Sequence, residues 1–176
     1  MKNRDITTWQ IIGFVAVSFG GTLLHFLYDW LSESVLIAPF SGVNESTWEH
    51  MKLLYFPLLL FAFIERRFFK ERSDFWCVKL AGTLLGLTLI PVLFYTYNGV
   101  FGTSPDWINI SIFFLAAAAV FLWETRLFNR RSLPCRHPLS ALILLLFIGV
   151  LFVVFTFFPP HIPLFQDPIT GGYGIL

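Results

Sequence analysis

Five long apolar runs constrain this chain more than any other feature of its sequence. They cover residues 9–30, 48–64, 76–95, 107–123 and 139–158. Each is close to the roughly 20 residues with which an α-helix crosses a hydrocarbon core of about 30 Å. Hydrophobic residues make up 56% of the chain, above the about 45–50% that is usual in soluble domains. We therefore expect an all-α polytopic integral membrane protein, with five transmembrane helices in a single membrane domain of residues 1–176.

Lysine and arginine gather on alternate connections, which predicts how the chain is oriented. They occur before the first run, in RRFFKER (residues 66–72) after the second, and in RLFNRRSLPCRH (residues 126–137) after the fourth. Under the positive-inside rule these segments face the cytoplasm. The N-terminus is then cytoplasmic, and a C-terminal tail of residues 159–176 is extracytoplasmic. Cys77 and Cys135 would lie at the reducing cytoplasmic face, so we expect free thiols.

Ionisable side chains concentrate where the second run begins, in the stretch VNESTWEHMK (residues 43–52). A helix from Lys52 to the end of this run would extend only about 20 Å, which is too short to cross the membrane. The span must therefore begin earlier and carry Glu45 and Glu49 into the outer interface. Glu45, Glu49 and Lys52 follow i, i+4, i+7 spacing, which places them on one helical face.

The first run contains a second polar pair at its outer end. His25 and Asp29 are four residues apart and share a helical face. Charged groups at membrane depth tend to face a bundle interior, where they are paired or hydrated. We therefore expect His25 and Asp29 to lie opposite Glu45, Glu49 and His50, around a polar cavity on the extracytoplasmic side.

The side chains of this cavity suit several kinds of chemistry. Histidine and carboxylates bind divalent ions such as zinc, which predicts His25, Asp29, Glu45 and Glu49 as metal ligands. Without a metal, His25 can accept a proton while Asp29 orients it, and Glu49 is a further candidate catalytic residue. A b-type haem held by His25 and His50 is a third alternative. The candidate ligand-binding residues are Tyr28, Asn44, Glu45, Trp48, His50, Lys52, Tyr95, Tyr97, Asp167, Thr170 and Tyr173.

Structural roles compete with these functional ones. Ser46 and Glu49 fit an S-x-x-E capping box, and Asn44 could cap the same helix one register earlier. Lys52 could extend to the interface or pair with Glu45. The histidine and aspartate of the first run could form an internal hydrogen-bonded pair between helices.

Two further acidic residues lie at the cytoplasmic ends of their runs. Glu65 and Glu124 both stand next to arginines in the sequence. We expect them to form ordinary interfacial ion pairs with these arginines.

The C-terminal tail combines turn-forming and apolar residues. Asp167-Pro168 and Gly171-Gly172 are turn signals, and Leu164, Phe165, Ile169, Tyr173 and Ile175 lie between and around them. We expect the tail to fold back as a lid, with Asp167, Thr170 or Tyr173 reaching the polar cluster. The alternative is a tail that lies flat in the membrane interface.

Three segments carry a resemblance to a known family. HFLYDW, NESTWEHMKLLYFP and LFQDPITGGYGI resemble a family of small bacterial membrane proteins, the domain of unknown function 6512. The resemblance extends over nearly the whole chain. It implies a multi-pass protein of the bacterial plasma membrane, and it implies no particular activity or cofactor.

Two functions from different classes follow as expectations. The first is a binding or transport-related protein whose outward-facing cavity holds a polar or cationic ligand. The second is a metal-dependent or His/Asp-dependent hydrolase or transferase that acts on lipid-linked substrates at the outer leaflet. The expected partners are the lipid bilayer and a lipid or small polar ligand. A net charge of +1 gives no reason to expect nucleic acid, because membrane orientation already accounts for the basic residues.

Overall fold

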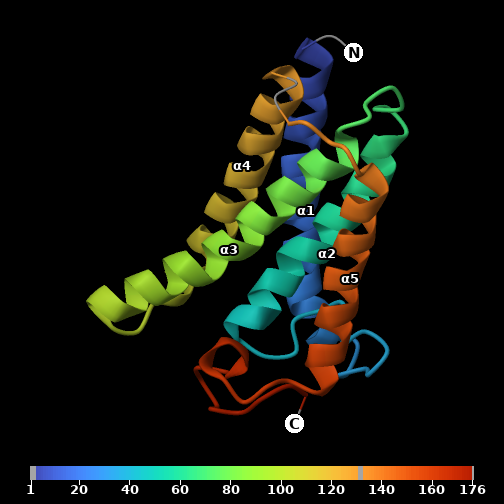
Figure 1. Cartoon of the computed structure of the whole chain (residues 1–176). Helices are drawn as coiled ribbons and strands as arrows, with labels where there is room; N and C mark the ends of the chain where they lie inside the picture. The colour runs from blue at the N-terminus through green and yellow to red at the C-terminus, as the bar shows by residue number, and fades with distance from the viewer. Residues whose placement is uncertain (1–2, 131–132, 176) are drawn as a thin grey trace.

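The computed structural model describes residues 3–130 and 133–175 as an all-α protein (Figure 1). Its helices fall on the five apolar runs, and each helix end lies within two helical turns of the corresponding end of its run. They are α1 (Asn3–Trp30), α2 (Thr47–Arg66), α3 (Phe75–Phe101), α4 (Asp106–Arg130) and α5 (Pro138–Phe157), followed by the short 3-10 helix η1 (Pro163–Phe165). The predicted all-α class is confirmed.

Four of these helices are long and apolar enough to cross a membrane, namely α1, α3, α4 and α5. The fifth, α2, differs in its charge. It carries Glu49, Lys52, Glu65 and Arg66 within 20 residues, and each charged side chain lowers the mean hydropathy of a helix sharply. Length and composition therefore support membrane helices without fixing how many times the chain crosses.

The bundle has two chemically different ends (Figure 1). At one end lie the start of α1, the connection 67–74 and the connection 133–137, which together we call the basic end. At the other end, here called the tail end, lie the loop 31–46 and the C-terminal tail. Lys2 and Arg131, which contributed to the predicted orientation, lie outside the described residues. The described basic segments share one end, as that prediction requires.

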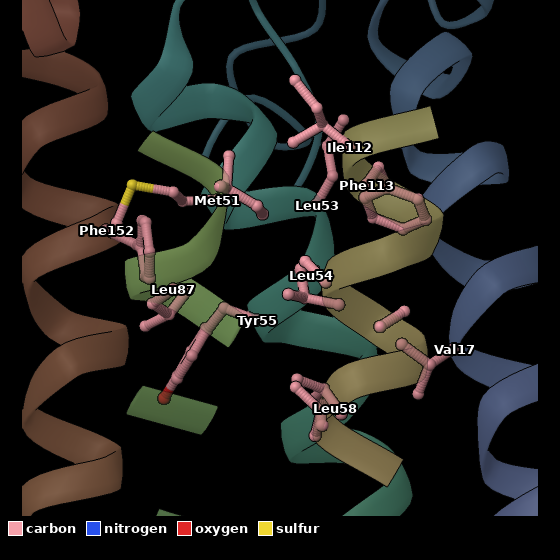
Figure 2. Packing of buried hydrophobic residues seen from close by; sticks show 14 of the residues in the cluster. Val17, Met51, Leu53, Leu54, Tyr55, Leu58, Leu87, Ile112, Phe113 and Phe152 are labelled. Carbon is pink, nitrogen blue, oxygen red and sulfur yellow. The ribbon is translucent and has the colours of Figure 1, made fainter. Parts of the chain in front are cut away.

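Between the two ends, the helices meet in an apolar layer (Figure 2). Val17 of α1, Leu54 of α2, Leu87 of α3, Phe113 of α4 and Phe152 of α5 are all buried there. Tyr55 brings the only hydroxyl among the side chains labelled in this view, and it donates a hydrogen bond of 2.5 Å to the carbonyl of Leu145. This layer separates the polar groups of one end from those of the other.

Two glycines four residues apart on α3, Gly82 and Gly86, bring helices close together. A Cβ on Gly86 would meet Val120 of α4 at 2.7 Å and Leu54 of α2 at 2.9 Å. A Cβ on Gly82 would overlap the side chain of Glu124. Both glycines thus allow α4 to pack directly on the backbone of α3.

The expectation of free thiols is wrong in this structure. Cys77 and Cys135 form a disulfide, with their Cα atoms 5.9 Å apart. Cys77 lies in the first turn of α3 and Cys135 in the connection before α5, so the fold places both at the basic end. The expectation came from the predicted compartment alone, and a sequence separation of 58 gave no sign that the two side chains meet.

Candidate functional site

The tail-end site begins with a loop that joins α1 to α2. After α1, Ser32 and Glu33 adopt positive φ angles of 54° and 58°, and the chain turns back along the helix that it has just left. Ser41 fastens the loop there, because its hydroxyl accepts a hydrogen bond of 2.9 Å from the Tyr28 amide and donates to the carbonyl of Leu24. The loop therefore returns to the level of His25 before α2 starts.

The start of α2 is fixed by a helix cap. Ser46 is the N-cap residue, and its hydroxyl accepts a hydrogen bond of 3.4 Å from the Glu49 amide. Asn44 forms a turn of its own by accepting a bond of 2.9 Å from the Ser46 amide. The predicted cap is thus present, although the Glu49 carboxylate accepts from the Val43 amide at 3.1 Å and does not close a capping box. These contacts hold Glu45 just outside the helix.

His25, Glu45 and His50 come together at this point, and we call them the tail-end triad. The two carboxylate oxygens of Glu45 face different histidines, at 3.7 Å from His25 Nε2 and 3.5 Å from His50 Nε2. One nitrogen or oxygen from each residue lies within 4.8 Å of the others. The side chains are 32%, 41% and 19% exposed for His25, Glu45 and His50 respectively, so solvent reaches the group.

The His50 ring has a defined proton arrangement. Its Nδ1 lies 3.0 Å from the carbonyl oxygen of Ser46. A carbonyl can only accept, so His50 donates its Nδ1–H to Ser46. In the neutral ring this leaves the Nε2 lone pair free, and Nε2 is the atom that faces Glu45. A backbone carbonyl on one ring nitrogen is the usual way in which a metal-binding histidine is oriented.

A small apolar pocket opens beside the triad. It has a volume of about 200 Å³, and its walls come from α1, α2 and α4. His25 and His50 form part of its lining, together with Gly21, Phe26, Leu53, Asn109, Phe113 and Phe114. The two histidines therefore lie between an aqueous surface and a space suited to an apolar group.

Glu49 and Lys52, two of the predicted site residues, form a separate buried pair. The Lys52 ammonium lies 2.5 Å from Glu49 Oε2, and the side chains are 0% and 3% exposed for Lys52 and Glu49 respectively. Lys52 also donates hydrogen bonds of 2.8 Å to the carbonyl of Ala38 and 3.0 Å to the hydroxyl of Thr156. It pairs with Glu49 and not with Glu45, and it joins α2 to the loop and to α5.

The tail folds back against α2, and its polar groups satisfy one another. Asp167 accepts hydrogen bonds from the Thr170 hydroxyl at 2.7 Å and from the Ile169 amide at 2.9 Å. Tyr173 stacks near His161, with ring centroids 4.6 Å apart. The carbonyl of Gly174 accepts a bond of 3.0 Å from the Asn44 side chain. The tail thus reaches the loop through Asn44, while Asp167 and Thr170 close a turn of their own.

The remaining predicted residues lie around the triad or away from it. Asp29 is exposed on α1, and the carboxylate in the triad is that of Glu45. Trp48 is buried among Phe152, Phe155 and Phe165, which anchors the tail. Tyr28 is buried, Tyr95 is exposed and Tyr97 is half-buried near the end of α3.

Sequence reasoning missed a second polar group, which lies near the basic end. Glu65, Lys79 and Glu124 are 0%, 3% and 0% exposed, and Gln10 is 2% exposed. We call these four residues the buried lysine cluster. The Lys79 ammonium lies 2.6 Å from Glu124 Oε2 and also pairs with Glu65, which accepts a bond of 2.6 Å from Gln10. Glu65 and Glu124 therefore pair with a lysine inside the bundle, and the expectation of interfacial pairs with arginine is wrong.

The family model for a family of unknown function, DUF6512, matches residues 1–175. The chain belongs to this family. No curated protein and no solved structure matches the chain. Membership confirms the resemblance carried by the three sequence segments.

Proposed function

We propose that this DUF6512 protein binds a divalent transition-metal ion, with zinc as the best fit, at the tail-end triad. In this proposal the chain crosses the plasma membrane five times, α2 included, with the basic end in the cytoplasm. The triad then opens to the extracytoplasmic side. The observation that carries the proposal is the convergence of three ligand atoms, from α1, the loop and α2, within 4.8 Å.

The spacing of the ligand atoms supports a metal more than direct ion pairing. Zinc binds histidine nitrogen and carboxylate oxygen at about 2.0–2.1 Å in tetrahedral geometry, which sets neighbouring ligand atoms about 3.3–3.4 Å apart. The two Glu45 oxygens lie 3.7 and 3.5 Å from the histidine nitrogens. These separations are long for N–H···O hydrogen bonds. They involve different oxygens of Glu45, and one ligand atom from each residue lies within 4.8 Å of the others, so the three side chains would have to draw together to bind zinc.

The layer between the two ends favours binding over passage through the protein. On α2, Leu54 and Leu58 lie between His50 of the triad and Glu65 near the basic end, and both are buried with Val17, Leu87 and Phe113 in the apolar layer (Figure 2). An ion crossing this layer would lose its hydration without gaining polar ligands. The transport-related form of the sequence prediction therefore has less support than a site that only binds.

Metal analysis of the purified chain tests this proposal. The protein is purified in detergent without chelator, loaded with zinc and desalted. We expect about one zinc per chain, and loss of that zinc in His25→Ala and Glu45→Gln. The matched control is His161→Ala, which removes another exposed tail-end histidine whose ring stacks on Tyr173. Equal zinc in His25→Ala and the wild type, or no zinc in the wild type, would refute the site.

A metal-dependent hydrolase is the second candidate, and the apolar pocket is the observation that favours it. Three protein ligands leave one zinc position for water, as in catalytic zinc sites, and zinc-bound water ionises near neutral pH. The pocket of about 200 Å³ lined by His25 and His50 could hold part of an acyl chain beside that water.

A pair of chromogenic esters separates this candidate from simple binding. Zinc-loaded protein is given a long-chain and an acetyl p-nitrophenyl ester. A hydrolase of this kind should cleave the long-chain ester faster, and His50→Ala should abolish the difference. Equal background rates in both proteins would leave the metal-binding proposal standing and remove the acyl-ester hydrolase.

Cysteine labelling tests the proposed orientation. Cys77 and Cys135 are replaced by serine, and one cysteine is introduced at Lys70, at the basic end, or at Ser104, between α3 and α4. A membrane-impermeant maleimide should label Ser104→Cys in intact cells and Lys70→Cys only after permeabilisation. The reverse pattern would place the triad in the cytoplasm. It would also put the Cys77–Cys135 disulfide in the oxidising compartment, where disulfides usually persist.

A further inference from the structure

We propose that the buried lysine cluster is a proton-binding site, in which Glu65 and Glu124 hold one proton between them in addition to the proton of the Lys79 ammonium. This inference is independent of the metal proposal, because the cluster lies on the other side of the apolar layer.

The charge count of the cluster is the first argument. Two carboxylates face one ammonium, so the fully ionised group carries a net charge of −1. Lys79, Glu65 and Glu124 are each at most 3% exposed. An unbalanced charge in such surroundings is costly, and a buried group relieves the cost by neutralising itself. One proton from water, bound to a carboxylate oxygen, makes the cluster neutral.

Two arginines close to the cluster, among the side chains that the structure describes, do not supply the missing positive charge. Arg66, next to Glu65 on α2, places its guanidinium over the ring of Phe75 at 5.5 Å and donates to the carbonyl of Phe69. Arg72 forms a two-pronged pair with Asp74, at 2.8 and 2.7 Å, and donates to the carbonyl of Phe128 at 3.0 Å. Both arginines are thus engaged with other groups.

Aromatic side chains surround the ammonium on its remaining sides. Lys79 Nζ lies 5.8 Å from the ring centres of Phe61 and Phe75 and 5.6 Å from that of Phe121. These rings come from α2, α3 and α4, while α1 contributes the uncharged Gln10. The rings favour the ammonium form of Lys79, so the proton of the lysine stays in place and the extra proton belongs to the carboxylates.

The hydrogen-bond inventory points to the same deficit. Glu124 Oε1 and Gln10 Oε1 are buried acceptor oxygens without a hydrogen-bond partner among the described residues. Rotating the side-chain amide of Gln10 would not give these oxygens a donor without losing another hydrogen bond, because its Nε2 already donates to Glu65 at 2.6 Å. Glu124 Oε1 packs on Gly82, where the absent side chain makes room for the carboxyl group. Buried acceptors are normally hydrogen-bonded, and a protonated carboxyl would supply an O–H donor where the cluster has too few.

Infrared spectroscopy of the full-length protein in detergent tests the proposal. A protonated buried carboxyl gives a C=O stretching band that ionised carboxylates lack and that shifts in D2O. We expect this band at neutral pH, at the intensity of one carboxyl per chain. Glu65→Gln and Glu124→Gln should each abolish it, because the one remaining carboxylate then balances Lys79. The matched control Glu71→Gln, which changes an exposed glutamate at the same end, should leave the band unchanged.

The carboxyl infrared band decides between the proton site and its alternatives. A band lost in both cluster variants and kept in the control supports the proton site, and using two variants guards against the misfolding of one. Absence of the band from the wild type at neutral pH refutes the proposal. A wild-type band that disappears when sodium chloride replaces choline chloride also refutes it, because the cluster then binds a cation in place of the proton.

Discussion

The tail-end triad and the buried lysine cluster use similar side chains at opposite ends of one bundle, yet they differ in their access to water. The triad residues are 19–41% exposed and their facing atoms stand 3.5–3.7 Å apart. The lysine cluster is at most 3% exposed, and Lys79 lies 2.6 Å from Glu124. The triad is exposed to solvent and its ligand atoms are separated, so it can accept a metal ion. The buried lysine cluster is closed to solvent and its charged groups are in direct contact, so it has room only for a proton.

The two regions also depend on different parts of the fold. Glu45 belongs to a loop, while each member of the lysine cluster lies within a helix. The comparison therefore predicts that changes to the lysine cluster alter the stability of the bundle, and that changes to the triad alter binding. The following predictions run from the largest expected effect to the smallest.

Removing the buried ammonium should have the largest effect. Lys79→Met leaves the ionised carboxylate of the buried lysine cluster without its cation, and breaking a buried ion pair in this way costs about 3–5 kcal/mol. The free energy of unfolding at neutral pH, followed by tryptophan fluorescence in detergent, should fall by that amount. The loss should shrink as pH falls, because a second proton then neutralises the remaining carboxylate. The control Lys70→Met changes an exposed lysine and should stay within about 0.5 kcal/mol.

Acidification should empty the triad. Protons compete with metal for histidine nitrogen, and free histidine titrates near pH 6.5. Zinc affinity should be highest above neutral pH and should fall as the pH is lowered, because both histidines of the triad must be deprotonated to bind the metal. Calorimetric titration with zinc at several pH values measures this. A flat affinity over these pH values would mean that the histidines are not ligands.

Loss of the helix cap should affect the tail end alone. Ser46→Ala removes the hydroxyl that accepts from the Glu49 amide, which costs about 1 kcal/mol, whereas Ser46→Gly should cost only a few tenths. Zinc affinity should weaken in step with stability, while the carboxyl infrared band of the lysine cluster stays the same. A change in that band would show that the apolar layer does not insulate the two ends.

The smallest effect is expected at Asp29. Asp29→Asn should change zinc affinity by less than about twofold, because this exposed carboxylate lies outside the triad and surface charges are screened by salt. Calorimetric titration of the variant with zinc, in the buffer used for the wild type, measures this affinity. A drop of tenfold or more would restore Asp29 to the ligand set that helical spacing predicts.

Sequence spacing located the helices well, because each apolar run matches the length of a membrane helix. It was less reliable for the site. His25, Glu45 and His50 were all among the predicted residues, but the reasoning that placed Glu45 and Glu49 on one helical face assumed a helix through both. The helix starts at Thr47, so Glu45 turns towards the histidines while Glu49 points inwards to Lys52.

The lysine cluster could not be found in the same way. Lys79 is a single charge near the start of an apolar run. Its partners lie on two other helices, and Glu124 is separated from it by 45 positions in the sequence. Local spacing carries no information about such a contact. The one available signal was that a lysine within a membrane helix needs a carboxylate at the same depth, and Glu65 and Glu124 lie at the matching ends of α2 and α4.

Lys52 has a consequence for how the protein is made. Its ammonium joins the carbonyl of Ala38, in the loop that carries Glu45, to the hydroxyl of Thr156, near the end of α5. Because α5 follows α1 to α4 in the chain, the ribosome must complete α5 before this junction can form. A product truncated before α5 would lack the junction and with it one of the contacts that hold the loop carrying Glu45.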